Sequence, residues 1–230
     1  MDATSTRDGR IAAVASLDQP VRRLLYDLLA ARDAWTSRDE AASALDVPRS
    51  VAAFHLDKLA DAGVVAVTFE RTSGRAGPGA GRPAKLYRLV ADEVSASMPD
   101  RHYDLAGQLL AAAVVESTAS GVPVDESLHR IAREAGRTMA HEGGGGDDEP
   151  GQDLLAALER WGYEPTQGDD GQISLANCPF HRLAEEHRSL VCGMNLDVIS
   201  GLLEGLEAGS TVRAHLDPQA GSCCVRLRPA

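Results

Sequence analysis

The sequence predicts an α+β fold in three parts, and three patterns along the chain support it. Residues 15–92 hold short helix-like segments followed by two strand-like segments. Residues 100–142 are rich in alanine and leucine and predict two helices. Residues 151–230 mix helices and strands, which predicts an α/β domain, and HEGGGGDDEP precedes them. Since four consecutive glycines do not hold a helix, this stretch is expected to be a linker.

The first part shows a helix pair followed by two strands. Residues 19–30 carry apolar residues at helical spacing. A second helix is expected over 37–45, because Ser37 and Glu40 form an S-x-x-E capping box. After the short turn Asp46–Val47, Pro48 is expected at the first position of a third helix, which ends at Gly63. The strands are VVAVTF and LYRLV, with the basic loop RTSGRAGPGAGRPAK between them.

The rest of the chain is expected to form four helices and three strands. The helices are predicted over residues 103–120, 125–141, 151–162 and 195–208, and the strands over 173–175, 211–216 and 223–228. The 103–120 helix is rich in small apolar residues. These suit either a dimer interface or an internal core helix, and the sequence leaves both open.

Charge is distributed unevenly along the chain. The net charge is −11, but residues 1–90 carry a net +2 and residues 91–230 a net −13. From Arg71 to Arg88 there are five basic residues and no acid. A phosphate backbone responds to such a local patch more than to the total charge. The chain has no secretory signal and no apolar run near 18 residues, so a cytoplasmic protein that does not span a membrane is expected.

A helix pair followed by two strands around a basic loop is the plan of a winged helix-turn-helix, in which the second helix of the pair enters the major groove of DNA. Ala52, Leu56 and Leu59 share one face of that helix and are expected to pack inward. The expected DNA-binding residues lie on its other face and on the loop: Arg49, Ser50, Phe54, Lys58, Arg75, Arg82 and Lys85.

These residues have chemistry suited to DNA. Arginine pairs with guanine, serine hydrogen-bonds base edges or phosphates, and Phe54 either contacts a thymine methyl group or belongs to the core. His55 is expected to be structural. Gly81-Arg82-Pro83 is typical of an arginine that enters a narrow minor groove, although a solvated charged loop is the alternative.

All four cysteines lie in the last part of the chain, at Cys178, Cys192, Cys223 and Cys224. In a reducing cytoplasm, clustered cysteines more often bind metal than form disulfides. Thiolates bind zinc or iron–sulfur clusters. If Cys223 and Cys224 begin a strand, they face opposite sides, so only one of them is expected to be a ligand. The alternatives are zinc, or buried cysteines without metal.

Two segments resemble a known family. SVAAFHLDKLADAG followed by SGRAGPGAGRPAKLYRL is similar to winged-helix regulators of the ArsR/DeoR type, and most to the SufR-like group. NCPFHRLAEEHRSLVCGMNLDVISGLLEGL and GSCCVRL resemble the sensor domain of that group. The resemblance implies a homodimeric regulator that binds a double-stranded DNA operator, and an iron–sulfur cluster held by Cys178, Cys192 and either Cys223 or Cys224. A further cysteine of the family pattern is absent here. The fourth ligand is then not cysteine, and the candidates are His181, His187, His215, Glu185 and Glu186.

The sequence therefore predicts a transcriptional repressor that senses iron–sulfur or redox status. The first alternative is a regulator that responds to zinc or to a small organic effector, with structural cysteines. An enzyme is not expected. Cys178 with His181 or His215 resembles a dyad, but no oxyanion hole or substrate site accompanies it.

Overall fold

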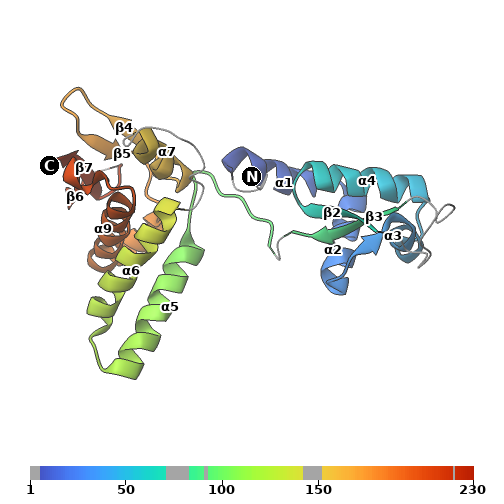
Figure 1. The fold of residues 1–230 in the computed structure, drawn as a ribbon, viewed down its shortest axis with the longest axis horizontal. Helices are drawn as coiled ribbons and strands as arrows, with labels where there is room; N and C mark the ends of the chain where they lie inside the picture. The colour runs from blue at the N-terminus through green and yellow to red at the C-terminus, as the bar shows by residue number, and fades with distance from the viewer. Residues whose placement is uncertain (1–5, 71–82, 91–92, 142–151, 220) are drawn as a thin grey trace. The chain divides into compact units, whose positions relative to one another are not determined.

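The computed structural model describes residues 6–70, 83–90, 93–141, 152–219 and 221–230. They form two compact units, residues 1–96 and 97–230 (Figure 1). Segments 100–142 and 151–230, which the sequence suggests are separate, share one hydrophobic core in the second unit. The expected basic loop, except its last three residues, and the linker HEGGGGDDEP, except its first residue, lie outside the described residues.

The first unit contains the expected helix pair and strands. Its elements in chain order are α1 (Arg7–Ser16), α2 (Pro20–Arg32), β1 (Thr36–Ser37), α3 (Arg38–Leu45), α4 (Arg49–Asp61), β2 (Val65–Glu70) and β3 (Ala84–Leu89). The strands form an antiparallel sheet in the order β1-β3-β2, with Val65 paired to Leu89 and Glu70 to Ala84. Together, the three strands and helices α2–α4 form a winged helix-turn-helix.

Local sequence explains where the helices of this unit begin and end. The capping box at α3 is present in full: Glu40 N–H donates to Ser37 Oγ at 3.2 Å, and Ser37 N–H donates to the Glu40 carboxylate at 2.7 Å. Helix α3 ends at Leu45. The next residue, Asp46, caps the helix, and its left-handed backbone (φ 51°) turns the chain toward α4. Pro48 caps α4 and does not occupy its first helical position, one residue from the expectation.

The second unit is built from helices packed beside a four-stranded sheet. Its helices are α5 (Tyr103–Ser120), α6 (Val124–His141), α7 (Gln152–Arg160), α8 (His181–Glu186), α9 (Arg188–Gly205) and the 3₁₀ turn η2 (Ala208–Ser210). Its strands are β4 (Pro165–Gln167), β5 (Ile173–Leu175), β6 (Val212–Leu216) and β7 (Val225–Pro229), ordered β4-β5-β7-β6. All pairings are antiparallel, so this unit is itself α+β and not the expected α/β domain.

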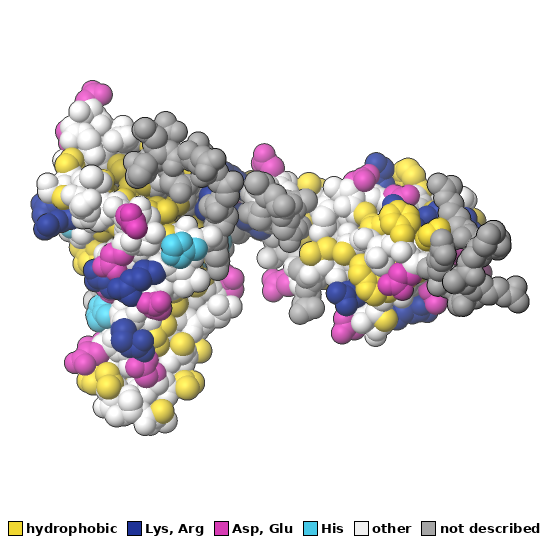
Figure 2. Space-filling view, viewed as in Figure 1, with side chains coloured by type: hydrophobic (Ala, Val, Ile, Leu, Met, Phe, Trp, Pro, Cys, Tyr) yellow, Lys and Arg dark blue, Asp and Glu magenta, His cyan; other side chains and the backbone are white. Residues whose placement is uncertain are grey.

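Helices α6 and α9 pack closely along their lengths, and α5 packs on α6 (Figure 1). The close approach depends on glycines, because a Cβ at Gly136 would overlap the carbonyl oxygen of Val198, and one at Gly201 would overlap that of Arg133. Ion pairs border this contact, including Arg133–Glu204 at 2.5 Å and Arg137–Glu204 at 2.8 Å. Figure 2 shows basic and acidic side chains interspersed on this part of the surface.

Candidate nucleic-acid interface and cysteine site

Helix α4 presents the two faces that its sequence predicts. Ala52, Leu56 and Leu59 are fully buried in the core of the first unit. The opposite face is exposed and carries four of the expected DNA-binding residues: Arg49, Ser50, Phe54 and Lys58. The Phe54 side chain is 56% exposed, so the alternative that it belongs to the core is wrong. The helix is therefore folded so that one face is free to enter a groove.

The described cations of this surface are paired with acids of the same unit. Arg49 forms an ion pair with Asp39 of α3, and Lys58 Nζ lies 3.1 Å from Asp61. All four side chains are largely exposed, and such pairs are worth little in water. Phosphate oxygens can therefore replace these carboxylates at small cost. Arg75 and Arg82 lie outside the described residues.

Lys85 differs from the expectation, because it lies in strand β3 and not in the loop. Its Nζ lies 2.6 Å from Asp57 Oδ1, and its side chain is only 23% exposed. Asp57 also accepts a hydrogen bond of 2.6 Å from the hydroxyl group of Tyr87, which is fully buried. Asp57 thus joins helix α4 to strand β3. Lys85 is a structural cation of this junction.

The electrostatics of this junction follow from burial and hydrogen bonding. Burial acts to raise the pKa of Asp57, but hydrogen bonds from Lys85 and Tyr87 outweigh it, and the net pKa is lowered. The pKa of Tyr87 is raised, first by burial and then by its hydrogen bond to Asp57. The junction is therefore a carboxylate held in its charged form by a neutral tyrosine and a charged lysine.

Replacing Asp57 by asparagine is expected to destabilise the first unit by about 1 kcal/mol near neutral pH, since the partly exposed ion pair and the phenol bond are weakened. The lowered pKa of Asp57 means that its contribution is present above the ordinary carboxyl range and is lost as the pH falls through the folded-state pKa. Urea unfolding, monitored by hydrogen exchange in α4, measures the difference in unfolding free energy between the wild type and Asp57→Asn. This difference should disappear in acid. Asp61→Asn, on the same helix, is the control and should change stability little. Equal losses in the two variants would contradict this assignment.

A hollow beside this junction contains residues that the sequence did not single out. It has a volume of about 520 Å³, and its lining includes Arg38, Arg49, Phe69 and Lys85. Phe69 is 65% exposed at the end of β2, where the chain enters the basic loop. An exposed aromatic residue directly before a basic loop is a signal that sequence reasoning had available and missed.

The four cysteines come from three segments of the second unit. Cys178 follows β5, Cys192 lies within α9, and Cys223 and Cys224 precede β7. Helix α9 begins seven residues before the expected 195, so Cys192 is not ahead of a helix as predicted. Cys223 and Cys224 lie before the strand, so the alternation of side chains along a strand does not decide between them.

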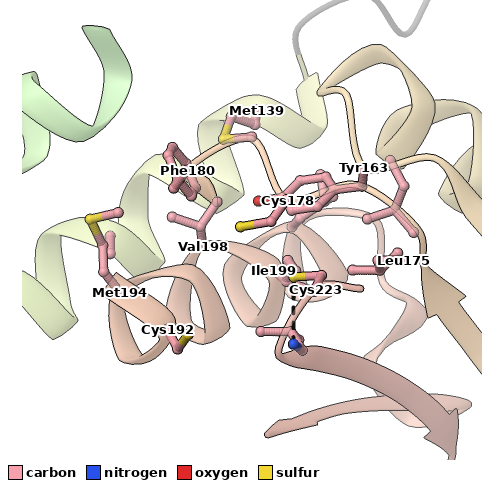
Figure 3. Close-up of a cluster of buried hydrophobic side chains, with 14 of the residues drawn as sticks. Met139, Tyr163, Leu175, Cys178, Phe180, Cys192, Met194, Val198, Ile199 and Cys223 are labelled. Carbon is pink, nitrogen blue, oxygen red and sulfur yellow. Dashed lines mark hydrogen bonds between the residues drawn. The ribbon is translucent and has the colours of Figure 1, made fainter. Parts of the chain in front are cut away.

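The thiols are grouped in two contacting pairs. Cys192 Sγ lies 2.7 Å from Cys224 Sγ, and Cys178 lies close enough to Cys223 for each thiol to shift the pKa of the other. Cys178 and Cys223 are buried with Cys192 among apolar residues that include Phe180 and Val198 (Figure 3). All four are free thiols. The fold thus brings together side chains up to 46 positions apart in the sequence.

Their pKa values differ with their surroundings. The hydrogen bond from Cys223 lowers the pKa of Cys178, whereas the same bond and burial raise the pKa of Cys223. Burial raises the pKa of Cys192 to about 12, and its contact with Cys224 adds to this. Cys178 is therefore the thiol of its pair that ionises first.

A buried network supports the first pair. Asn195 Nδ2 lies 3.2 Å from Cys223 Sγ, and Asn195 Oδ1 accepts a hydrogen bond of 2.6 Å from Tyr163. The amide N–H of Val225 lies 3.5 Å from the same sulfur. Asn195 and Tyr163 are buried. Sequence reasoning missed both, because an asparagine inside a helix carries no sign that its partner is a distant cysteine.

A pocket opens beside the thiols, with a volume of about 310 Å³. Three cysteines line it, Cys178, Cys223 and Cys224, together with His181 and Glu185 among the candidate further ligands. His181 Nε2 lies 3.3 Å from Glu185 Oε1. Ser222 also lines the pocket, and its Oγ is buried without a hydrogen-bond partner among the described residues.

Comparison with known proteins gives a family match within the first unit. The family described as "Helix-turn-helix domain" matches residues 17–68, which span α2, α3 and α4 and enter β2. No curated protein and no solved structure matches the chain. Among the described residues, no helix is long and apolar enough to cross a membrane.

Proposed function

We propose that this DNA-binding transcriptional regulator senses iron–sulfur cluster or redox status through Cys178, Cys192, Cys223 and Cys224, and that it acts as a homodimeric repressor. One observation carries the proposal: the fold brings together four thiols from three distant segments, of which Cys178, Cys223 and Cys224 line one pocket and Cys192 contacts Cys224. Buried cysteines used only as small apolar residues have no reason to meet in this way. The helix-turn-helix match supplies the DNA-binding half.

The donor set fits an iron–sulfur cluster in its chemistry. Thiolates are the usual ligands of such clusters, and Cys178 is already the more acidic thiol of its pair. No group of three or more His, Cys, Asp or Glu side chains within the described ranges is arranged as a metal site. Cys178, Cys192, Cys223 and Cys224 would hold the cluster, and the bound cluster would supply electron-transfer chemistry and sensitivity to oxidants.

Helix α5 supports the homodimer. Apart from its ends, the helix has no charged residue between Asp104 and Glu116, and its valines Val114 and Val115 are 52% and 69% exposed. Helix-turn-helix proteins that bind as dimers read two half-sites about one helical turn of DNA apart. A second copy seated on this apolar face would bring two DNA-binding units into one dimer.

Anaerobic reconstitution tests the proposed function. The full chain is incubated with ferrous iron, sulfide and a thiol reductant, desalted, and analysed for iron, acid-labile sulfide and visible absorption before and after exposure to air. We expect iron and sulfide to be retained in similar amounts, with colour that air bleaches. A colourless protein without iron or sulfide would overturn the proposal, and stoichiometric zinc in its place would establish the zinc alternative.

Arg82→Ala is expected to weaken binding to DNA and to lower the slope of log affinity against log salt by about 1, since one phosphate contact is lost. The probe is a duplex that the wild-type protein selects from a random pool, and affinity is measured over a series of salt concentrations. Arg182→Ala, at an exposed arginine of the second unit, is the control. An unchanged slope for Arg82→Ala would show that Arg82 makes no phosphate contact.

A further inference from the structure

Residues 100–102, which lead into the second unit, are hydrogen-bonded directly to the loop that carries Cys178. Arg101 Nη1 donates to the side-chain oxygen of Asn177, to the carbonyl oxygen of Asp100 at 2.9 Å, and to that of Cys178 at 3.4 Å. The donor is a charged guanidinium group, so the two bonds to Asn177 and Cys178 are charge-assisted bonds to the loop itself. The guanidinium group therefore responds to the position of the Cys178 backbone.

Asn177, in the Cys178 loop, also donates hydrogen bonds back to the segment before α5. Its side chain is buried, and Nδ2 donates to the carbonyl oxygens of Asp100 at 3.0 Å and Gly162 at 2.5 Å. One residue further along, the His102 amide donates to the carbonyl oxygen of Pro179 at 3.1 Å. Residues 100–102 are thus held by the residues on both sides of Cys178, immediately before α5 begins.

The other end of this segment belongs to the first unit. Val94 packs on the core of the first unit, and the division between the two units falls after Ala96. The chain therefore joins the units through a short stretch between Val94 and Asp100. Releasing residues 100–102 would add up to about 3.5 Å of reach for each residue freed.

We propose that Arg101 and Asn177 are positioning residues that transmit the state of Cys178 to the segment joining the two units. When a ligand fixes the Cys178 loop, the bonds to residues 100–102 are strengthened and the joining segment is held short. When the ligand is lost, the loop and the segment loosen together. This inference rests on the proposed function, because it takes a ligand at the cysteine site as its input.

The test uses the full chain, with Cd²⁺ as a thiolate-binding probe under reducing conditions that do not themselves bind the metal. Thiolate-to-metal charge-transfer absorption reports binding, and hydrogen exchange of the amides of residues 97–102 reports the segment. Arg101→Gln removes the charged donor, and Arg182→Gln is the matched control. Far-ultraviolet circular dichroism confirms that each variant is folded, and Arg101→Lys retains a charge if Arg101→Gln does not fold.

We expect Cd²⁺ to slow exchange in the wild type and in Arg182→Gln by about tenfold, since opening of the segment then requires release of the loop. In Arg101→Gln, Cd²⁺ should give the same absorption but change exchange by less than about twofold. Thiolate absorption without an effect on wild-type exchange would overturn the inference alone, as would an undiminished effect in Arg101→Gln. Absence of thiolate absorption would instead overturn the proposed function and remove the input on which the inference depends.

Discussion

Replacing Gly201 by valine is expected to prevent stable folding of the second unit. Even a Cβ at this position would overlap the carbonyl oxygen of Arg133 on α6, and backbone atoms do not yield as the end of a flexible side chain does. Overpacking a close contact costs about 1–3 kcal/mol and occasionally more, and the valine adds two methyl groups to the overlap. The loss is a large part of the stability of a typical domain.

The neighbouring contacts leave little room for relaxation. A Cβ at Gly136 would lie against the backbone of Val198, and one at Gly205 would lie 2.6 Å from the Cβ of Ala140. Moving α9 away from α6 would therefore break the contact along the whole length of the pair. We expect the valine variant to be insoluble or to lose the cooperative thermal transition of this unit.

Gly107→Ala is the matched control for this prediction. Gly107 also lies inside a helix, α5, but a Cβ there meets no atom within 4 Å. Alanine should be neutral or should stabilise the protein by up to about 1 kcal/mol, because glycine is the poorer helix former. Thermal unfolding of the two variants compares them directly. A Gly201→Val protein as stable as the wild type would contradict the close backbone contact between α6 and α9.

Cys178→Ser is expected to lower the iron and sulfide retained after desalting to less than about a tenth of the wild-type amount. Serine keeps the approximate size of the side chain but replaces the thiolate donor. The serine hydroxyl retains a polar group beside Cys223, so the variant tests the loss of the thiolate donor and not the loss of the neighbouring side chain. Iron and sulfide analysis after anaerobic reconstitution gives the measurement.

Ser222→Ala is the control for the cysteine variant, because Ser222 lines the same pocket without a thiol. We expect it to retain iron and sulfide at the wild-type level. Circular dichroism separates loss of the ligand from loss of the fold in each protein. Full cluster content in folded Cys178→Ser would remove Cys178 from the ligand set.

Much of the first unit is readable from its sequence because its signals are local. The capping box Ser37–Glu40 and the inward face of α4 each depend on residues within three or four positions, and the structure confirms both. Strand β1 has only two residues and was missed, because it exists through pairing with Tyr87 and Leu86 far along the chain. The N-terminal helix α1 was missed because it begins with the polar stretch RDGR and has only one buried residue, Ala13.

The second unit shows where such reasoning stops. All four cysteines lie near the C-terminus, and this indicated one site. Which cysteines contact each other depends on how β5, α9 and β7 pack, and the spacing of residues along the chain does not show that packing. The early start of α9 was missed because Arg188 and Ser189 give no apolar periodicity, although Leu190 and Val191 follow. Asn177 and Arg101 are 76 positions apart, and nothing in either segment indicates the other.

The pairing of Arg49 with Asp39 and of Lys58 with Asp61 has a consequence for how the protein finds its target in a genome. A face with uncompensated cations would bind every stretch of DNA and spend its time on the millions of competing sites that a genome offers. On α4, Arg49 and Lys58 each have a carboxylate beside them, so a phosphate must displace that carboxylate, at a cost of at most about 1 kcal/mol for each exposed pair, before it gains the contact. We therefore expect α4 to bind random sequence somewhat more weakly than a helix face with two unpaired cations would.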